Sequence, residues 1–404
     1  SATAHTSNIN CNGNAVVSSG NMTLGNFAGG QSFFYLADNR SFTLSSPGTV
    51  NCAAAGNGNL QIGTISVTNP NASLILNGGD LVLANGGNGT INSYGDLYLN
   101  SGTLSRTSGT GTIILRAQGA SITTPKLQTI TQGTAVVSGT ISITFGIVGP
   151  SYSLVTLGSD VDFGPGSSTT VSSGSFLDFG NYTYTGLNFT QNSGANLITA
   201  NVDGINTILT GNIGSLRTTN TRTMNASGQF IYNGTSPQET GTAVVSALYL
   251  SIFNTTGVTL SANCTIQTTG QLILNLSGLH GKLSLTNFNL TLSGTASILG
   301  ASTNDYVVTN GTGRLVMPVS SADVTFPVGA TTTTYNPLIL NNAGGTADNY
   351  GVRVLNSTAT PAPNDATKLV ERYWVVTEGV AGGNSLAVSA EYNSGEDNVT
   401  FSAG

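Results

Sequence analysis

The chain has 404 residues, a formal net charge of −6 and only 7% charged residues. Its 11 lysines and arginines lie singly along the sequence, so no basic stripe is available for phosphates and we expect no nucleic-acid partner. The 38% hydrophobic content excludes the composition of a disordered chain, and no apolar run is long enough for a membrane helix, so we expect no membrane insertion.

Residues 1–58 are the least regular part of the sequence. We expect this segment to be a cap that covers the open end of a stack of strands, or an extended arm. Cys11 and Cys52 lie here in similar Asn-rich settings, which makes them a candidate disulfide in an extracellular protein. The chain begins Ser-Ala-Thr without Met, which favours a processed, secreted protein.

Residues 59–316 carry short strand patterns punctuated by Gly and Asn. Gly79-Asp80-Leu81-Val82-Leu83 returns as Gly95-Asp96-Leu97-Tyr98-Leu99, and alternate Leu residues place the apolar side chains on one face. Such short strands bury that face only by stacking, which predicts a β-solenoid. With about 16 to 22 residues per rung and about 4.8 Å between rungs, the region would form a rod roughly 55 to 75 Å long.

Residues 317–404 change character, because longer strand patterns such as those around Phe326, Val352 and Trp374 are separated by polar loops. This spacing predicts an antiparallel β-sandwich, with Trp374 packed in its core. The expected fold class is therefore all-β, with a β-solenoid rod followed by a C-terminal antiparallel β-sandwich.

Several segments resemble a known group of proteins. They are Tyr232-Asn233-Gly234-Thr235, Tyr306 to Val316, Phe326-Pro327-Val328-Gly329 and Arg372-Tyr373-Trp374. Together they are similar to secreted cell-surface proteins of the Bacteroidota that the type IX secretion system exports. The resemblance covers about residues 220 to 392 and implies a β-solenoid followed by a β-sandwich at the cell surface. Similar proteins continue with further strands, so the resemblance also implies a sandwich lacking strands that a neighbour supplies.

The sequence offers little for catalysis, metal binding or a cofactor. His5 and His280 are far apart and neither accompanies a nucleophile pattern, so we expect no enzyme activity and no cofactor. Asp160 and Asp162 share one strand face and are weak candidates for a calcium site or an acid pair, although a solvated turn explains them more simply. The same holds for three acidic residues near the C terminus, Glu391, Glu396 and Asp397. Cys264 is expected to be a small buried residue.

Three functions remain open. The first is a non-enzymatic extracellular fibre subunit that polymerises head to tail, with residues 1 to about 20 as a strand donated to the next copy. The second is a surface adhesin that binds glycans or other cells through exposed aromatic residues such as Tyr350, Tyr373 or Tyr392. The third and least favoured is a polysaccharide-active β-helix enzyme that uses Asp160 and Asp162.

Overall fold

Every regular element in the described part of the chain is a β-strand. The computed structural model describes residues 6–26, 28–64, 71–121, 124–147, 152–207, 213–356, 370–383, 385–393 and 396. The chain divides into two compact units, of which unit 1 comprises Ser1–Asn201 with Thr207–Gly228, and unit 2 comprises Val202–Asn206 with Gln229–Gly404. The prediction of an all-β fold is confirmed.

Unit 1 is a stack of coils whose strands pair in parallel with those of the next coil. One side of the stack is a nine-stranded sheet of β1 (Thr6–Cys11), β4 (Gln31–Leu36), β7 (Asn57–Ile62), β9 (Asn88–Ser93), β11 (Thr110–Leu115), β14 (Ile141–Phe145), β17 (Ser168–Val171), β20 (Asn188–Gln191) and β23 (Arg222–Thr223). From β1 to β20 each strand pairs in parallel with the next in this order.

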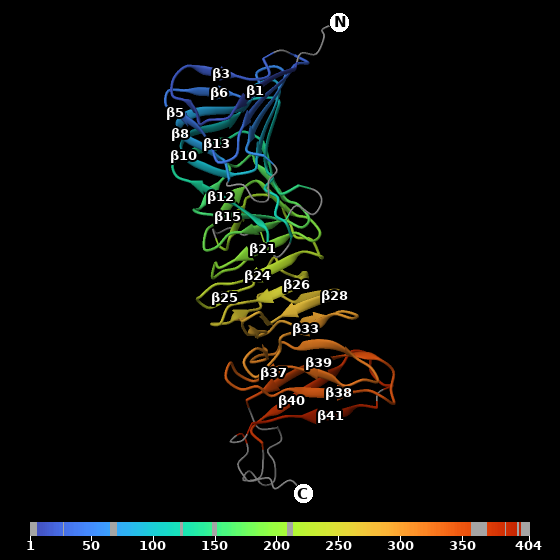
Figure 1. The fold of residues 1–404 in the computed structure, drawn as a ribbon. Coiled ribbons are helices and arrows are strands. Elements are labelled where there is room, and N and C mark those ends of the chain that lie inside the picture. Colours follow the sequence, from blue (N-terminus) through green and yellow to red (C-terminus); the bar gives the residue numbers. More distant parts are fainter. Residues whose placement is uncertain are drawn as a thin grey trace. The chain divides into compact units, whose positions relative to one another are not determined.

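The other sides of the unit 1 coils are built in the same way. A second ladder contains β2 (Ala15–Val17), β5 (Ser41–Ser45), β8 (Ser73–Ala84), β10 (Asp96–Arg106), β12 (Lys126–Gln132), β15 (Ser153–Leu157), β18 (Phe176–Asp178) and β21 (Asn196–Thr199). Figure 1 shows β5, β8, β10, β12 and β15 one below another. The third side contains β3 (Asn21–Thr23), β6 (Thr49–Asn51), the second halves of β8 and β10, and β13 (Val136–Ser138). Farther along the chain, a short parallel sheet contains β16 (Val161–Asp162), β19 (Tyr184–Gly186) and β22 (Leu216–Thr218).

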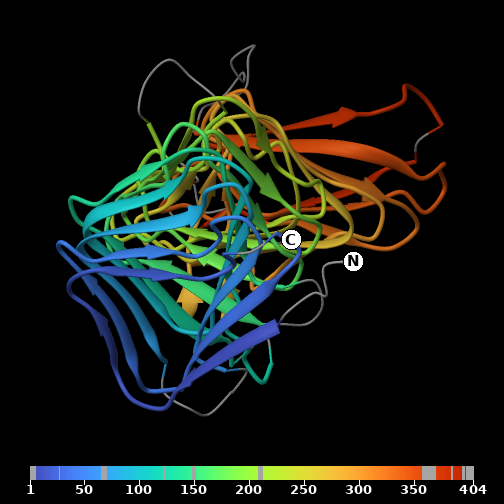
Figure 2. The same ribbon diagram turned by 90° about the horizontal axis from the view of Figure 1, so that it is seen from above.

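The core of unit 1 consists of columns of apolar side chains at matching positions of successive coils. Phe42, Leu74, Leu97 and Ile130 are aligned by strand pairing, and each is at most 1% exposed. Figure 2, seen from above, shows the N-terminal strands in blue running along different sides of this interior. Side chains alternate between the two faces of a strand. A constant register therefore keeps every second residue of each strand pointing into the core. The prediction of a β-solenoid-like fold is confirmed.

Unit 2 continues the parallel pattern and then changes to antiparallel pairing. Its parallel ladders contain β24 (Gln229–Tyr232), β26 (Ser246–Ile252), β28 (Cys264–Ile273), β32 (Leu290–Leu292), β33 (Ser297–Leu299) and β35 (Leu315–Val319), and also β25 (Gln238–Glu239), β27 (Val258–Thr259), β31 (Leu283–Ser284), β34 (Val307–Val308) and β37 (Val328–Gly329). A small hairpin joins β29 (Asn275–Leu276) to β30 (Leu279–His280).

The change occurs at β35, which pairs in parallel with β32 and antiparallel with β39 (Asp348–Leu355). β39 pairs with β40 (Tyr373–Glu378), and a separate antiparallel sheet contains β36 (Val324–Phe326), β38 (Leu338–Asn341) and β41 (Ala387–Ala390). The predicted change to antiparallel strands near residue 317 is therefore confirmed. That these strands close into a sandwich remains a prediction.

The N-terminal boundary was predicted wrongly. Residues 6–58 are no separate cap or arm, because β1 to β6 already belong to the parallel ladders of unit 1. The coil positions of this segment carry varied apolar residues, such as Phe34 and Leu36, in place of paired leucines. A repeat defined by leucines therefore could not identify the first coils.

The two copies of the Gly-Asp-Leu motif do not stack on each other. Leu81 pairs with Leu104, whereas Leu97 pairs with Leu74, so the copies lie on different sides of the coils. Matching positions in successive coils are 25 residues apart at Ser7 and Ser32 and 31 apart at Asn57 and Asn88. These coils are longer than predicted, because one coil contains several short strands that share the same alternating pattern.

Glycine is required where a chain segment crosses close to an inward-facing position of the nine-stranded sheet. A Cβ on Gly89 would lie 1.6 Å from the carbonyl oxygen of Leu83, whereas one on Gly111, the next residue in the same column, would lie 3.1 Å from the side chain of Arg106. Only the first contact is with backbone atoms that cannot rotate away.

We predict that Gly89→Ala destabilises the protein by about 3 kcal/mol, because the backbone must move to admit the methyl group. The matched control is Gly111→Ala, for which a flexible side chain gives way and the loss stays below about 1 kcal/mol. Denaturant unfolding followed by circular dichroism measures both. Equal midpoints for the two variants would contradict this account of the column.

Candidate assembly interface

The first coil of unit 1 ends in strand edges without a partner. Within the described residues, β1 pairs only with β4, β2 only with β5, and β3 only with β6. The backbone N–H and C=O groups along the other side of β1, β2 and β3 are therefore available for pairing with a further strand. We call these three strands the open coil.

Apart from Ser7, the inward-facing side chains of the open coil are apolar and only partly covered. Ile9 is 49% exposed, although Leu60 and Ile91 in the same column are 0% and 1% exposed. Val17 and Met22 head the columns of Leu44 and Val50 and are also half-buried. The open coil thus presents an apolar interior surrounded by unpaired strand edges.

The antiparallel part of unit 2 has edges of its own. Among the described residues, β40 pairs only with β39, and β41 pairs only with β38. Val388 of β41 lies opposite Leu340 and is 55% exposed, while Leu340 is fully buried. Trp374 of β40 lies opposite the buried Val354 and is itself half-buried, so the predicted packing of Trp374 in a core is only partial.

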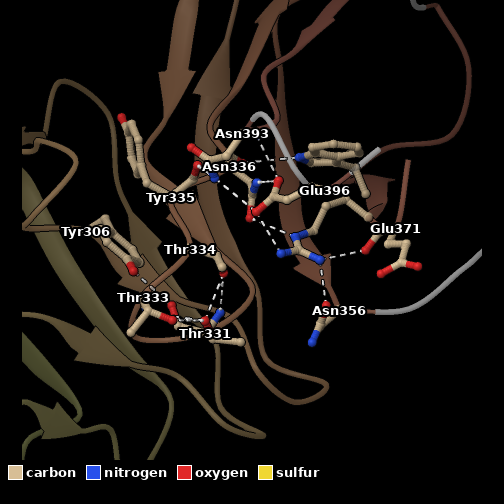
Figure 3. A network of polar contacts seen from close by, with 12 residues as sticks. Tyr306, Thr331, Thr333, Thr334, Tyr335, Asn336, Asn356, Glu371, Asn393 and Glu396 are labelled. Carbon is tan, nitrogen blue, oxygen red and sulfur yellow. Dashed lines mark hydrogen bonds and ion pairs between the residues drawn. The ribbon is translucent and has the colours of Figure 1, made fainter. Parts of the chain in front are cut away.

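A polar network fixes the chain where β40 begins (Figure 3). Arg372 Nη2 and Glu396 Oε1 are 2.6 Å apart, and both side chains are more than nine-tenths buried. Asn336 Nδ2 donates to Glu396 Oε2 at 2.6 Å, and the backbone and side chain of Asn393 donate to the two carboxylate oxygens at 2.9 Å. Trp374 Nε1 donates to the carbonyl oxygen of Asn336 at 3.2 Å. The network therefore connects Asn393 and Glu396 to Asn336, which precedes β38, and to Arg372 and Trp374 at the start of β40.

The surroundings of Glu396 lower the pKa of its carboxyl group. Burial raises this pKa, but the hydrogen bonds from Asn393 and Asn336 and the positive charge of Arg372 lower it more. Glu396 was expected to be solvated, and that expectation is wrong, because the residue is only 8% exposed. Glu391 is exposed, and Asp397 lies outside the described residues. The sequence around an acidic residue does not show which arginine will neutralise it in the folded protein.

Asp160 and Asp162 lie where the sequence places them, on either side of the buried Val161, and both are exposed. Asp160 Oδ1 accepts a hydrogen bond from the Thr183 N–H at 2.9 Å, and Asp162 Oδ1 accepts one from the Gly164 N–H at 2.7 Å. Within the described ranges there is no group of three or more His, Cys, Asp or Glu residues that could hold a metal ion. Asp160 therefore holds the next coil, and Asp162 holds the local bend at Gly164.

The cysteines and His280 occupy structural positions. Cys11 and Cys52 are free thiols, so the predicted disulfide is absent; Cys11 ends β1 and its Sγ donates to the Gly13 carbonyl, while Cys52 is buried after β6. Burial raises the pKa of Cys52 and Cys264 to about 12, which keeps both thiols protonated and unreactive. Cys264 is buried as predicted.

His280 ends the small hairpin of unit 2, and its Nδ1 lies 3.2 Å from Oδ1 of the buried Asp305. His5 lies outside the described residues.

The segments expected to contact partners are placed differently from the predictions. Thr6–Cys11 and Ala15–Val17 already pair with β4 and β5 of the same chain, so the N-terminal segment is not a free donor strand, and residues 1–5 lie outside the described residues. Tyr350 is 1% exposed and is therefore no surface contact, whereas Tyr373 and Tyr392 are 40% and 39% exposed. The open coil was missed because its role depends on which strands remain unpaired.

Comparison of the chain with protein-family models, with curated proteins and with solved structures gave no significant match. Among the described residues, no helix is long and apolar enough to cross a membrane.

We predict that Glu396→Gln loosens β40, because it leaves the buried Arg372 charge unpaired at a cost of about 3 to 5 kcal/mol. Since the pKa of Glu396 is lowered on folding, its contribution is complete above the ordinary pKa of about 4.3 and is lost as pH falls through the folded value. Hydrogen exchange of the β40 amides at neutral and acidic pH measures both effects. Glu391→Gln, at an exposed residue, is the control. Equal protection of the β40 amides from exchange in the two variants would show that the Glu396 network does not hold β40.

Proposed function

We propose that the chain is a non-enzymatic structural protein, a subunit of an extracellular fibre at the cell surface that assembles head to tail through β-strand contacts between copies. The observation that carries the proposal is the open coil, in which half-exposed apolar residues such as Ile9 are bordered by unpaired strand edges. Solenoids that remain single normally cover their terminal coil with a polar repeat, and soluble sheets protect their edges.

The open coil has none of the usual protection against edge pairing. Charged residues, above all Lys, and Pro commonly prevent a strand edge from adding another strand. The sequences of β1, β2 and β3 are TSNINC, AVV and NMT, which contain no charge and no proline. This absence supports a partner that pairs with the edge.

A second copy of the chain is the partner that fits. The antiparallel part of unit 2 offers the unpaired edges of β40 and β41, beside which Val388 and Trp374 are incompletely covered. In our proposal β35, β39 and β40 form one layer of a sandwich, β36, β38 and β41 form the other, and the open coil of the next copy completes it. Two different surfaces then meet, and such a contact propagates into a filament unless it closes a ring.

The contact proposed here differs from the exchange of a free donor strand. β1 remains paired with β4 and offers only its outer edge. Secretion through the type IX system belongs to the same proposal and is supported by the sequence resemblance alone.

A monomeric surface adhesin is the second candidate. The exposure of Tyr373 and Tyr392, at 40% and 39%, favours it, since exposed aromatic rings are common contact residues in binding sites. The polysaccharide-active enzyme is least favoured, because Asp160 and Asp162 both accept hydrogen bonds from backbone amides, of Thr183 and Gly164 respectively.

We predict that Ile9→Lys prevents polymerisation and leaves a folded monomer, because a charge at the head of an apolar column is buried only when a partner covers the open coil. Thr112→Lys is the matched control, since Thr112 points to the outer face of β11, a strand that already pairs with β9 and β14. Negative-stain electron microscopy and light scattering of wild type and both variants measure assembly. Wild-type protein that stays at 40.9 kDa at all concentrations would overturn the proposal.

A further inference from the structure

The outer face of the nine-stranded sheet is a regular grid of uncharged polar side chains. Alternate residues of each strand point outward, and parallel pairing aligns them in rows across the sheet. One row contains Asn8, Phe33, Asn59, Thr90, Thr112 and Ser142. Positions in a row repeat about every 4.8 Å, and alternate positions along a strand repeat about every 6.7 Å.

The outward strand positions of this face contain no Asp, Glu, Lys, Arg or His over eight successive strands, and the guanidinium of Arg116, which follows β11, donates to Asn92 Oδ1 at 2.9 Å. From β1 to β20 the outward positions contain Asn, Gln, Ser and Thr, with Phe33, Tyr35 and Ile114 as the exceptions. A face without charge gives no electrostatic attraction to an acidic or basic polymer. The ligand that fits it is neutral and rich in hydrogen-bonding groups.

Two aromatic rings interrupt the grid near its N-terminal end. Phe33 and Tyr35 are on the same face of β4, and their rings are nearly parallel, with centroids 5.7 Å apart and an angle of 9° between the planes. Both are half-buried and therefore offer part of their surface to a ligand. Parallel flat rings at successive outward positions suit the flat apolar faces of sugar rings.

A hollow of about 280 Å³ lies beside Phe33. The outward-facing residues that line it are Gln31, Phe33, Asn57, Asn59, Asn88 and Thr90. It therefore combines one aromatic ring with five side chains that carry amide or hydroxyl groups, the mixture that orients a small polar ligand against an apolar surface.

Two hydrogen bonds orient the amides of the hollow. Asn88 Nδ2 donates to Asn57 Oδ1 at 3.0 Å, and Asn92 Nδ2 donates to Asn59 Oδ1 at 3.0 Å. The side-chain oxygens of Asn57 and Asn59 therefore each accept one hydrogen bond. Their side-chain N–H groups and the hydroxyl of Thr90 have no hydrogen-bond partner within the part of the chain that the structure describes. These donors are fixed in direction before any ligand arrives, which lowers the entropy cost of binding.

We propose that this face binds a neutral polysaccharide, with sugar rings against Phe33 and Tyr35 and sugar hydroxyls on the amides of Asn57 and Asn59. An extended polysaccharide is favoured because the row spacing is close to the length of one sugar unit, so successive units meet successive strands. The inference is independent of fibre assembly, because it uses the outward side chains of the sheet, whereas assembly uses the edge of β1.

The test is retention of the full chain on insoluble cellulose and chitin, with acidic alginate gel as the charged comparison. We expect retention on at least one of the two neutral polymers, none on alginate, and no weakening at high salt, since no ion pair is involved. Phe33→Ala and Tyr35→Ala should each weaken binding about tenfold. Tyr182→Ala, which removes a 40% exposed ring elsewhere in unit 1, should leave binding unchanged.

A second variant leaves the rings in place. Asn57→Asp keeps the oxygen that accepts from Asn88 but removes the free N–H donor, so it should weaken binding while unfolding at the same temperature as wild type. Failure of wild type to bind either neutral polymer would overturn the proposal, as would equal binding by the Phe33, Tyr35 and Asn57 variants. Neither result would affect the filament test, which is read from mass and microscopy.

Discussion

The structure depends on parallel backbone hydrogen bonding in which each coil repeats the register of the one before it. This register brings Phe42, Leu74, Leu97 and Ile130 into one buried column, and a shift by one residue would turn every member of such a column toward solvent. It also determines where glycine is needed, because the approach of Leu83 to Gly89 leaves no room for a side chain. Packing and backbone pairing are therefore fixed together.

A stack of this kind has to end, and the two units end differently. In unit 2, β35 pairs in parallel on one side and antiparallel on the other, so the ladder continues into β39 and β40. In unit 1 nothing comparable covers β1, β2 and β3 within the described residues, and Ile9 remains half exposed at the head of its column. The difference gives the chain a direction, since one unit changes its pairing pattern and the other leaves its pattern open. In our proposal this asymmetry favours head-to-tail contact over contact between like surfaces.

Much of the fold could be predicted because its signals are local. Alternating Leu residues indicate short strands wherever they occur, and the longer strand patterns after Pro318 mark the antiparallel strands. The side of the coil on which each strand lies could not be predicted, because Leu81 and Leu97 both follow Gly-Asp in the sequence but have different partners in space. The Arg372 and Glu396 pair was missed for the same reason, since its members are joined by folding and not by a motif. The open coil is harder still, because a missing partner leaves no pattern in the sequence.

The stacked register explains the low charge of the chain, and the low charge affects both proposed contacts, those at the edge of β1 and on the outer face of the nine-stranded sheet. In a parallel stack, a charged residue at an outward position faces the matching position of the next coil at about 4.8 Å, so like charges would repel along the whole ladder. Asn, Gln, Ser and Thr avoid this repulsion and can bond along the stack, as Asn88 does with Asn57. The same choice leaves the outer face neutral, which suits an uncharged polysaccharide. It also leaves the edge of β1 without the charges that normally keep strands from pairing. One requirement of the fold thus leaves both surfaces open to contact.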